Sequence, residues 1–300
     1  MPKSLAERLG FAPTDRIAII HCDDIGMCHA ANEGAFEALA SGPATCGSLM
    51  VPCPWFLEAA ERARENPGID LGVHLTLNSE WPTYRWGPVA PRDRVASLLD
   101  ADGMLPRTLL EVAKQALPDE VEIELRAQIE RALAVGVDVT HIDAHMGTAL
   151  VPKFVPVYAR LAAEFRLPAF AVRPDPVALA ARGMGGFDSV FAAAVGLLEK
   201  VGSPVLEAFD ADSLEFPEGR GIEHNTGRLE RLVPGLNYLI CHPARDGEEL
   251  RAVMPWGAHQ RDFERSFYGG EAGRRALAER GLRTLGMRPL RDLMRGRSAG

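Results

Sequence analysis

Compact runs of hydrophobic residues alternate with longer amphipathic stretches along most of the chain. The runs are short and mostly Val, Ile and Leu, which is typical of strands buried on both faces of a parallel sheet. The clearest amphipathic stretch, residues 119–134, begins at Asp119, which can cap a helix, and is stopped by Gly136. We predict strands at residues 16–21, 45–51, 69–77, 137–143, 168–173, 204–210 and 235–241, and helices at residues 30–39, 55–65, 119–134, 154–165 and 224–232, with another ending near residue 200.

Strands that alternate with helices predict a parallel sheet with crossover helices, and therefore an α/β fold. About seven such units favour an irregular TIM-type (β/α) barrel over an open sheet, and 300 residues suit one barrel. No repeat or linker divides the chain, so we predict a single barrel-like catalytic domain over residues 1–300, with a helical C-terminal segment from about residue 262. Residues 78–103 lack periodicity and are predicted to form a long loop, and residues 183–187 a flexible connection.

Composition and charge narrow the class of partner. The chain has 41 acidic and 33 basic side chains, a net charge of -8 and a pI near 5.6. This balance argues against nucleic acid, whose phosphates require clustered Lys and Arg. No hydrophobic run approaches the ~20 residues of a membrane span, and the five cysteines form no CxxC pair. We therefore predict a cytoplasmic protein with reduced thiols and a small-molecule partner. A homodimer is compatible with this prediction.

Ionisable residues follow the predicted strands rather than being scattered. In an α/β barrel the carboxyl ends of the strands form one rim, and that rim holds the active site. Nucleotide-binding, serine-hydrolase and zincin motifs are absent from the chain. The strand ends instead carry Asp23 and Asp24, then His74, then His141, Asp143 and His145, then Arg173, and finally His242.

The adjacent carboxylates of Asp23 and Asp24 point in different directions if the strand continues, because successive side chains alternate. One carboxylate can then bind a metal ion while the other acts as a base. The alternative is an ordinary helix cap. His74 shares the small, polar face of its strand with Gly72 and Thr76, which favours a ligand over a histidine of the hydrophobic core.

His141, Asp143 and His145 lie at positions i, i+2 and i+4 of one strand and therefore share a face. Such a group is costly to bury unless it binds something. Either histidine can be a metal ligand, and Asp143 can orient one by accepting its second N–H. His242 either ends its strand without a role or acts as a general acid.

Four short motifs in order resemble those of the YdjC-like carbohydrate (chitooligosaccharide) deacetylases. They begin at Cys22, Gly72, Thr140 and Cys241 and read CDDIG, GVHLTL, THIDAH and CHP, and the resemblance spans about residues 16–245. It implies a barrel-like fold shared with the wider polysaccharide deacetylases and metal-dependent removal of acetyl groups from N-acetylated sugars. It also implies that the metal ligands are Asp24, His74 and His145, the base Asp23 and the acid His242.

These inferences predict a hydrolase with one divalent metal ion, foremost Mg²⁺ or Zn²⁺, and a carbohydrate substrate. Another metal-dependent barrel enzyme acting on sugars, an isomerase or a phosphoesterase, is the first alternative. A non-catalytic sugar-binding module is the second. Arg173, together with Trp81 and Trp86 of the long loop, is predicted to contact substrate, since aromatic rings stack on sugar faces.

Overall fold

The strands form one parallel sheet, and the computed structural model describes residues 3–181 and 186–296. The strand order is β4-β3-β2-β1-β6-β5, with β7 paired to β1. Every pair in the sheet is parallel, as the alternation of strands and helices predicts. The strands are β1 (Arg16–Ile25), β2 (Cys46–Leu49), β3 (Leu71–Leu75), β4 (Val139–Ala144), β5 (Ala208–Asp210), β6 (Gly235–Cys241) and β7 (Arg283–Thr284).

The edges at β4 and β5 are not joined by a regular strand. The segment predicted as a strand at residues 168–173 forms only isolated bridges, Ala169 with Ile142 of β4 and Val172 with Leu206 ahead of β5. Pro168 has no N–H to donate, which limits the pairing of this segment. The prediction of a full strand there is wrong, whereas the α/β, barrel-like class is confirmed with a sheet that does not close completely.

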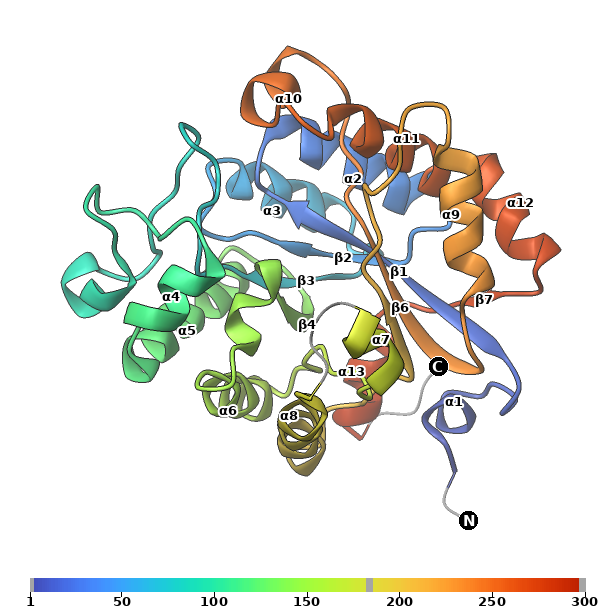
Figure 1. The fold of residues 1–300 in the computed structure, drawn as a ribbon, viewed down its shortest axis with the longest axis horizontal. Helices are drawn as coiled ribbons and strands as arrows, with labels where there is room; N and C mark the ends of the chain where they lie inside the picture. Colours follow the sequence, from blue (N-terminus) through green and yellow to red (C-terminus); the bar gives the residue numbers. More distant parts are fainter. Residues whose placement is uncertain (1–2, 182–185, 297–300) are drawn as a thin grey trace.

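Helices surround the sheet (Figure 1): α2, α3 and α11 lie above it in that view, α5 and α6 to the left, and α9 and α12 to the right. Of these helices, α2 contacts β1 and β2, and α5 contacts β3, so they cover one face of the sheet. The helices are α1 (Leu5–Arg8), α2 (His29–Ser41), α3 (Phe56–Glu65), α4 (Leu109–Gln115), α5 (Pro118–Ala134), α6 (Val155–Phe165), α7 (Pro176–Ala181), α8 (Asp188–Lys200), α9 (Gly221–Glu230), α10 (Glu248–Val253), α11 (Ala258–Tyr268), α12 (Glu271–Glu279) and α13 (Arg288–Met294).

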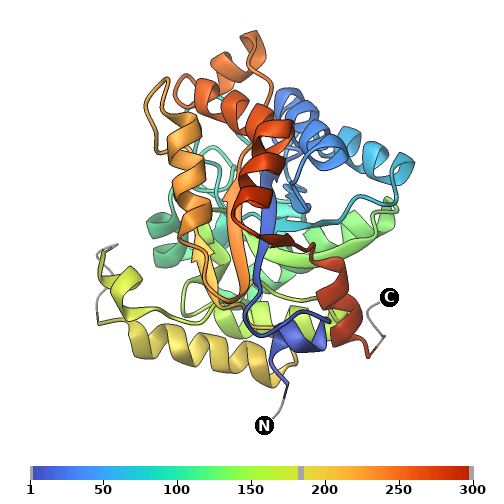
Figure 2. The same ribbon diagram turned by 90° about the vertical axis from the view of Figure 1, so that its right-hand side faces the viewer.

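A smaller hydrophobic cluster is separate from the large one beneath the helices. Ile17 and Ile19 of β1 contribute to it with Leu236 and Tyr238 of β6. Alternate residues of each strand therefore face this interior, while Ala18 and Ile20 belong to the large cluster. Residues of α1 and α13 also join the smaller cluster, and Figure 2 shows these two helices together at the lower end of the sheet. That end holds the beginnings of the strands, so the opposite end remains for a site.

The loop and C-terminal predictions are met in part. Residues 78–103 form a long connection that contains two short 3-10 helices, Arg92–Arg94 and Ala96–Leu98. The C-terminal segment is mostly helical, but β7 interrupts it and adds a short strand beside β1. Of the predicted connection at 183–187, residues 183–185 lie outside the described residues.

Candidate metal centre

Three side chains from separate strand ends converge at the upper end of the sheet. Asp24 lies near the end of β1, His74 within β3, and His145 directly after β4 at the start of a 3-10 helix, His145–Leu150. Oδ1 of Asp24 is 3.3 Å from Nδ1 of His145 and 3.8 Å from Nε2 of His74. One potential ligand atom from each residue lies within 4.8 Å of the other two, and all three side chains are buried.

The backbone at the end of β1 brings both aspartates to this place. Asp24 has φ 63°, Gly26 has φ +92°, and the pairing of β1 with β2 shifts register between Cys22 and Ile25. A left-handed residue breaks the alternation of the strand, and Asp tolerates that conformation better than most residues. Asp23 Oδ2 therefore lies 4.0 Å from His74 Nε2, close to Asp24. The expectation that the two carboxylates point apart is wrong for this reason.

Each of the three side chains is held by a further partner. Nδ1 of His74 lies 2.9 Å from Oδ1 of Asp143, which turns Nε2 toward Asp24. Nε2 of His145 lies 3.1 Å from Glu80, a residue of the long loop. An Arg261 guanidinium nitrogen donates to Oδ2 of Asp24 at 3.0 Å, which leaves Oδ1 facing the imidazoles.

The electrostatics of the cluster favour a positive charge. Burial lowers the pKa of His145, but the Glu80 and Asp24 carboxylates outweigh burial and raise it to about 10. Burial acts against the charged form of His74 as well, yet Asp143 raises its pKa. Burial raises the pKa of Asp24, but Arg261 and His145 bring it well below its usual range. The carboxylates around the two imidazoles favour a positive charge at the cluster, and a metal ion can supply that charge once the imidazoles release their protons.

Asp23 and His242 lie beside the cluster without belonging to it. Oδ1 of Asp23 is 2.6 Å from Nδ1 of His21, whereas Oδ2 is 3.8 Å from Nε2 of His242. Nδ1 of His242 lies 2.7 Å from the Ser213 hydroxyl, which also contacts both carboxylate oxygens of Glu264. Burial lowers the pKa of His242, which eases release of a proton from its charged form.

His141 lies below the cluster, and the three predicted substrate residues differ in their positions. His141 is fully buried below the cluster and contacts His21 rather than Asp24. Trp86 is 3% exposed, donates Nε1–H to the Asn78 carbonyl and places its ring against His145. Trp81 is partly buried against the hydrophobic core, and its indole nitrogen has no hydrogen-bond partner among the described residues. The Arg173 side chain, 59% exposed, pairs with Glu199 of α8.

Five residues at the site carry no prediction from the sequence. His21 had a usable signal, because it lies two positions before Asp23 and shares its face of β1. The other four lie in the long loop, in the connection after β5 and in α11, where no periodicity points to the rim. They are Glu80, Ser213, Arg261 and Glu264.

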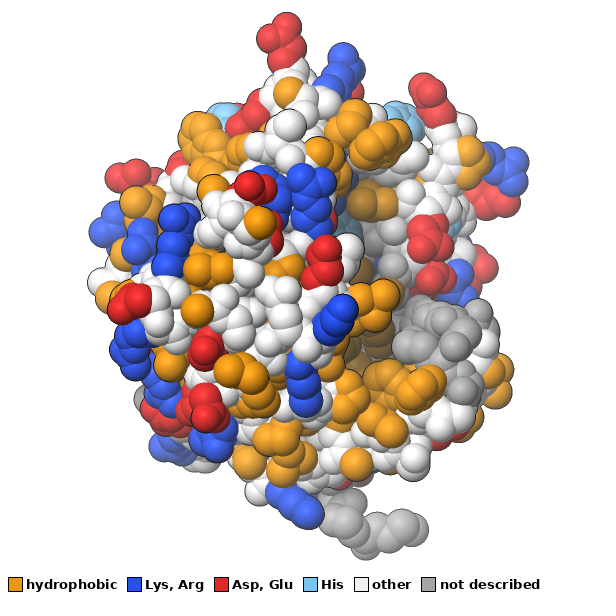
Figure 3. Space-filling view, turned by 60° about the vertical axis from the view of Figure 1, so that its left-hand side comes forward, with side chains coloured by type: hydrophobic (Ala, Val, Ile, Leu, Met, Phe, Trp, Pro, Cys, Tyr) orange, Lys and Arg blue, Asp and Glu red, His pale blue; other side chains and the backbone are white. Residues whose placement is uncertain are grey.

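The surface agrees with a small-molecule site. Lys and Arg side chains are interspersed with Asp and Glu over the face in Figure 3, which also shows a recess in that face. Among residues 3–181 and 186–296, no helix is long and apolar enough to cross a membrane.

Comparison with known proteins gives relatives along most of the chain. A carbohydrate deacetylase from Thermus thermophilus is 38% identical over 259 residues, 86% of this chain and 89% of that protein. A carbohydrate deacetylase from Thermoanaerobacter pseudethanolicus is 26% identical over 82% of this chain and 88% of its own. A chitooligosaccharide deacetylase from Yersinia enterocolitica is 32% identical over 51% of this chain and 58% of its own.

The fold also has a solved counterpart. The crystal structure of a protein from Enterococcus faecalis V583 named "putative cellobiose-phosphate cleavage protein" superposes with a TM-score of 0.76, covering 92% of this chain and 99% of that one at 24% identity. This similarity concerns the fold alone. The family model described as YdjC-like protein matches residues 17–279, which confirms the family predicted from the four motifs. With that match and a relative aligned over nearly its whole length, the chain belongs to the YdjC-like protein family.

Proposed function

We propose that this protein is a metal-dependent carbohydrate deacetylase, a hydrolase that removes the acetyl group from an N-acetylated sugar or oligosaccharide. The observation that carries the proposal is the arrangement at the rim. Three potential ligands converge on one point, and the Asp23 carboxylate and the His242 imidazole, which are outside this group, lie beside it. The names of the relatives supply the substrate class. A cytoplasmic location and a homodimer stay predictions.

The residues present fit a divalent metal ion. Asp24, His74 and His145 would hold it through one carboxylate oxygen and two imidazole nitrogens, a donor set that favours Zn²⁺ over Mg²⁺. His74 already has its second N–H engaged by Asp143, as is usual for histidine ligands. When bound, such an ion would lower the pKa of a water molecule and polarise the acetamide carbonyl.

The remaining residues account for the proton transfers of amide hydrolysis. Asp23 has one oxygen occupied by His21 and one, Oδ2, directed at the cluster, so Oδ2 takes the proton from the attacking water. His242 donates a proton through Nε2 to the departing amine. Its Nδ1–H is held by Ser213, whose hydroxyl donates to Glu264, and that carboxylate favours the charged imidazole.

Two other classes of function fit the same ligands. An isomerase or phosphoesterase using the same ion releases no acetate, and a sugar-binding module has no turnover. The position of Asp23 beside the ligands but outside their set favours a hydrolase over a binding module, which has no need for a second acid.

Metal analysis combined with an acetate-release screen over N-acetylated mono- and oligosaccharides tests the proposal. We expect one equivalent of a divalent ion and acetate release that stops after chelation and resumes when the ion is restored. Release of phosphate or formation of an isomer without acetate would instead favour the rival enzymes. Saturable binding without any product would favour the module.

Asp143→Ala is expected to weaken metal binding by roughly 10–100-fold, because His74 loses the acceptor that fixes its orientation. Titration of the metal-free protein measures the effect, with circular dichroism to verify folding. Asp102→Ala, which removes an exposed carboxylate of the long loop, is the matched control and should not change affinity. Equal affinities in two folded variants would mean that His74 needs no support.

The two tryptophans of the long loop are expected to differ in their effects. Trp81→Ala should change kcat/KM between monosaccharide and oligosaccharide substrates by roughly 2- to 10-fold, because we propose that its ring contacts sugar. Trp86→Ala should lower activity on all substrates alike, since its buried ring supports His145. Comparison of the substrate profiles decides the matter. An unchanged profile in Trp81→Ala would remove that residue from the substrate site.

A further inference from the structure

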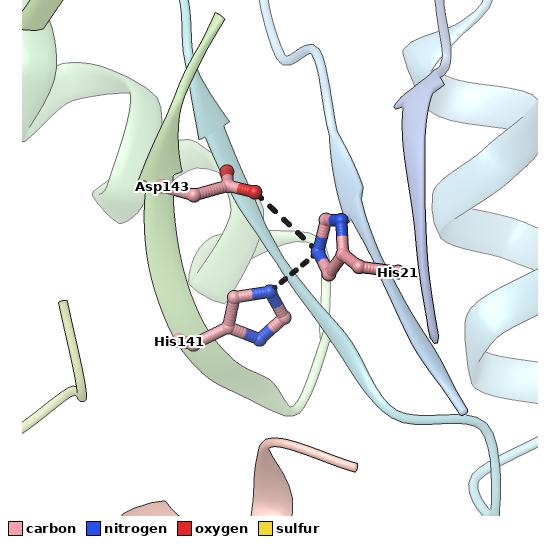
Figure 4. Close-up of side chains that lie close together, drawn as sticks. All are labelled: His21, His141 and Asp143. Carbon is pink, nitrogen blue, oxygen red and sulfur yellow. Dashed lines mark hydrogen bonds and ion pairs between the residues drawn. The ribbon is translucent and has the colours of Figure 1, made fainter. Parts of the chain in front are cut away.

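A row of buried polar side chains runs downward from Asp23 into the interior of the sheet. Nδ1 of His21 contacts Oδ1 of Asp23 at 2.6 Å, and Nε2 of His21 contacts Nε2 of His141 at 2.8 Å. Nδ1 of His141 lies 2.9 Å from the Thr140 hydroxyl, which donates to Asp70. Figure 4 shows the two imidazoles with Asp143 beside them, Oδ2 of which is 3.4 Å from Nε2 of His21.

The fold fixes the place of both rings. His21 and Asp23 share one face of β1, so both point into the interior. The His21 ring stacks on Tyr238, with centroids 4.9 Å apart and planes at 28°, and no part of His21 is exposed. Gly72 of β3 makes room for His141, because a Cβ on that glycine would lie 2.6 Å from the imidazole. His21 therefore has little freedom to leave Asp23.

The chemistry of the two groups shows which atom donates in the hydrogen bond between His21 and Asp23. An ionised carboxylate can only accept, so Nδ1 of His21 carries the hydrogen whenever Asp23 is able to act as a base. A hydrogen bond to a carboxylate is among the stronger ones in proteins. One hydrogen lies between Nε2 of His141 and Nε2 of His21. Nδ1 of His141 contacts the Thr140 hydroxyl. Burial lowers the pKa of His141 to about 3, so that ring is neutral and its single hydrogen lies either on Nδ1 or between the two Nε2 atoms.

We propose that His21 is a positioning residue for the base. Its Nδ1–H holds Oδ1 of Asp23, and this leaves Oδ2 as the oxygen directed at the metal ligands and at His242. His141 holds the other nitrogen of His21 and so keeps the ring in place. The inference rests on the proposed function only in that Asp23 is the base there; the hydrogen bond itself can be measured without turnover.

A second metal ion between His21, His141 and Asp143 is the rival interpretation of the same residues. Two observations disfavour it. The 2.8 Å separation of the two Nε2 atoms is that of a hydrogen bond. Asp143 is already occupied, because it accepts from the Ser48 and Tyr238 hydroxyls and contacts His74.

Two variants of His21 of similar size, one with a donor in the place of Nδ1 and one without, test the proposal. In His21→Asn the amide nitrogen can replace Nδ1, whereas His21→Leu has no donor. We expect kcat of His21→Leu to fall by about 10- to 100-fold with KM and metal content unchanged. His21→Asn should recover most of that loss. If His21→Leu kept kcat, or if His21→Asn fell as far as His21→Leu, the positioning role would be wrong.

A second measurement does not depend on activity. Nitrogen-15 NMR of the wild-type protein labelled at histidine should show Nδ1 of His21 carrying a hydrogen, with the resonance assigned by its loss in His21→Asn. An unprotonated Nδ1 at neutral pH would overturn the inference even in a protein that releases acetate. The metal analysis should find one equivalent per chain. A second equivalent that is lost in His141→Ala would place an ion on the rival site and overturn the inference as well.

Discussion

Asp23→Asn is expected to lower kcat for acetate release by about 10²–10⁴-fold while the metal remains bound. The change replaces one carboxylate oxygen by an amide nitrogen and barely alters the volume. The amide oxygen can still accept from His21, so the side chain can keep its place. What is lost is the basic oxygen near His74 Nε2, and with it the ability to take a proton from water. Steady-state kinetics and metal analysis on the same preparation measure both parts.

The neighbouring aspartate is the matched control for that experiment. Asp24→Asn makes the same chemical change one residue later, at the side chain that faces both imidazoles. It should lose metal, and its activity should fall for that reason. If Asp23→Asn retained wild-type kcat, another group would have to be the base. If it lost metal as readily as Asp24→Asn, Asp23 would have to be counted among the ligands.

The general position of the site could be predicted because of the topology. In parallel sheets the carboxyl ends of all strands lie on one side, so polar residues after hydrophobic runs must meet there. Asp24, His74 and His145 come from β1, β3 and the end of β4 and are brought together in this way. The roles of these residues stay predictions until the variants are measured.

The choice between His141 and His145 as the residue near Asp24 could not be predicted from strand geometry. An extended strand would place both imidazoles on one face, but β4 ends at Ala144. His145 begins a 3-10 helix in which Met146 and Gly147 have positive φ, and the chain turns at the rim. The residue at which a strand ends depends on packing as well as on the residues of the strand. The sequence pattern alone therefore does not predict that residue.

Most of the residues that contact the candidate ligands could not be predicted from the sequence. Arg261 lies 237 positions from the aspartate it pairs with, and it is carried by α11, whose packing against α2 brings it to Asp24. Glu80 reaches His145 from an irregular loop. Contacts of this kind depend on the final packing of distant elements and leave no periodic signal. The interior face of β1 is different, because alternation from Asp23 leads directly to His21.

His145→Ala is expected to abolish stable metal binding, whereas His141→Ala should retain the ion. Nδ1 of His145 lies 3.3 Å from Asp24 Oδ1, so its loss leaves only one imidazole at the cluster. The decrease in affinity should exceed the roughly 10–100-fold associated with residues that merely support a ligand. His141 contacts His21 and Thr140 instead, so its removal leaves all three candidate ligands in place.

The two variants make the same chemical change at positions four residues apart, so they are a matched pair. Both imidazoles are buried, so both variants should lose stability through the cavity that forms, and thermal unfolding of the metal-free proteins separates this loss from metal binding. Metal content after dialysis then reports the ligand alone. Full occupancy in His145→Ala together with an empty site in His141→Ala would transfer the ligand role to His141 and would displace the site downward into the interior. Retention in His141→Ala, with loss in His145→Ala, would place the ion at the rim, where Oδ2 of Asp23 lies 4.0 Å from Nε2 of His74 and 3.8 Å from Nε2 of His242.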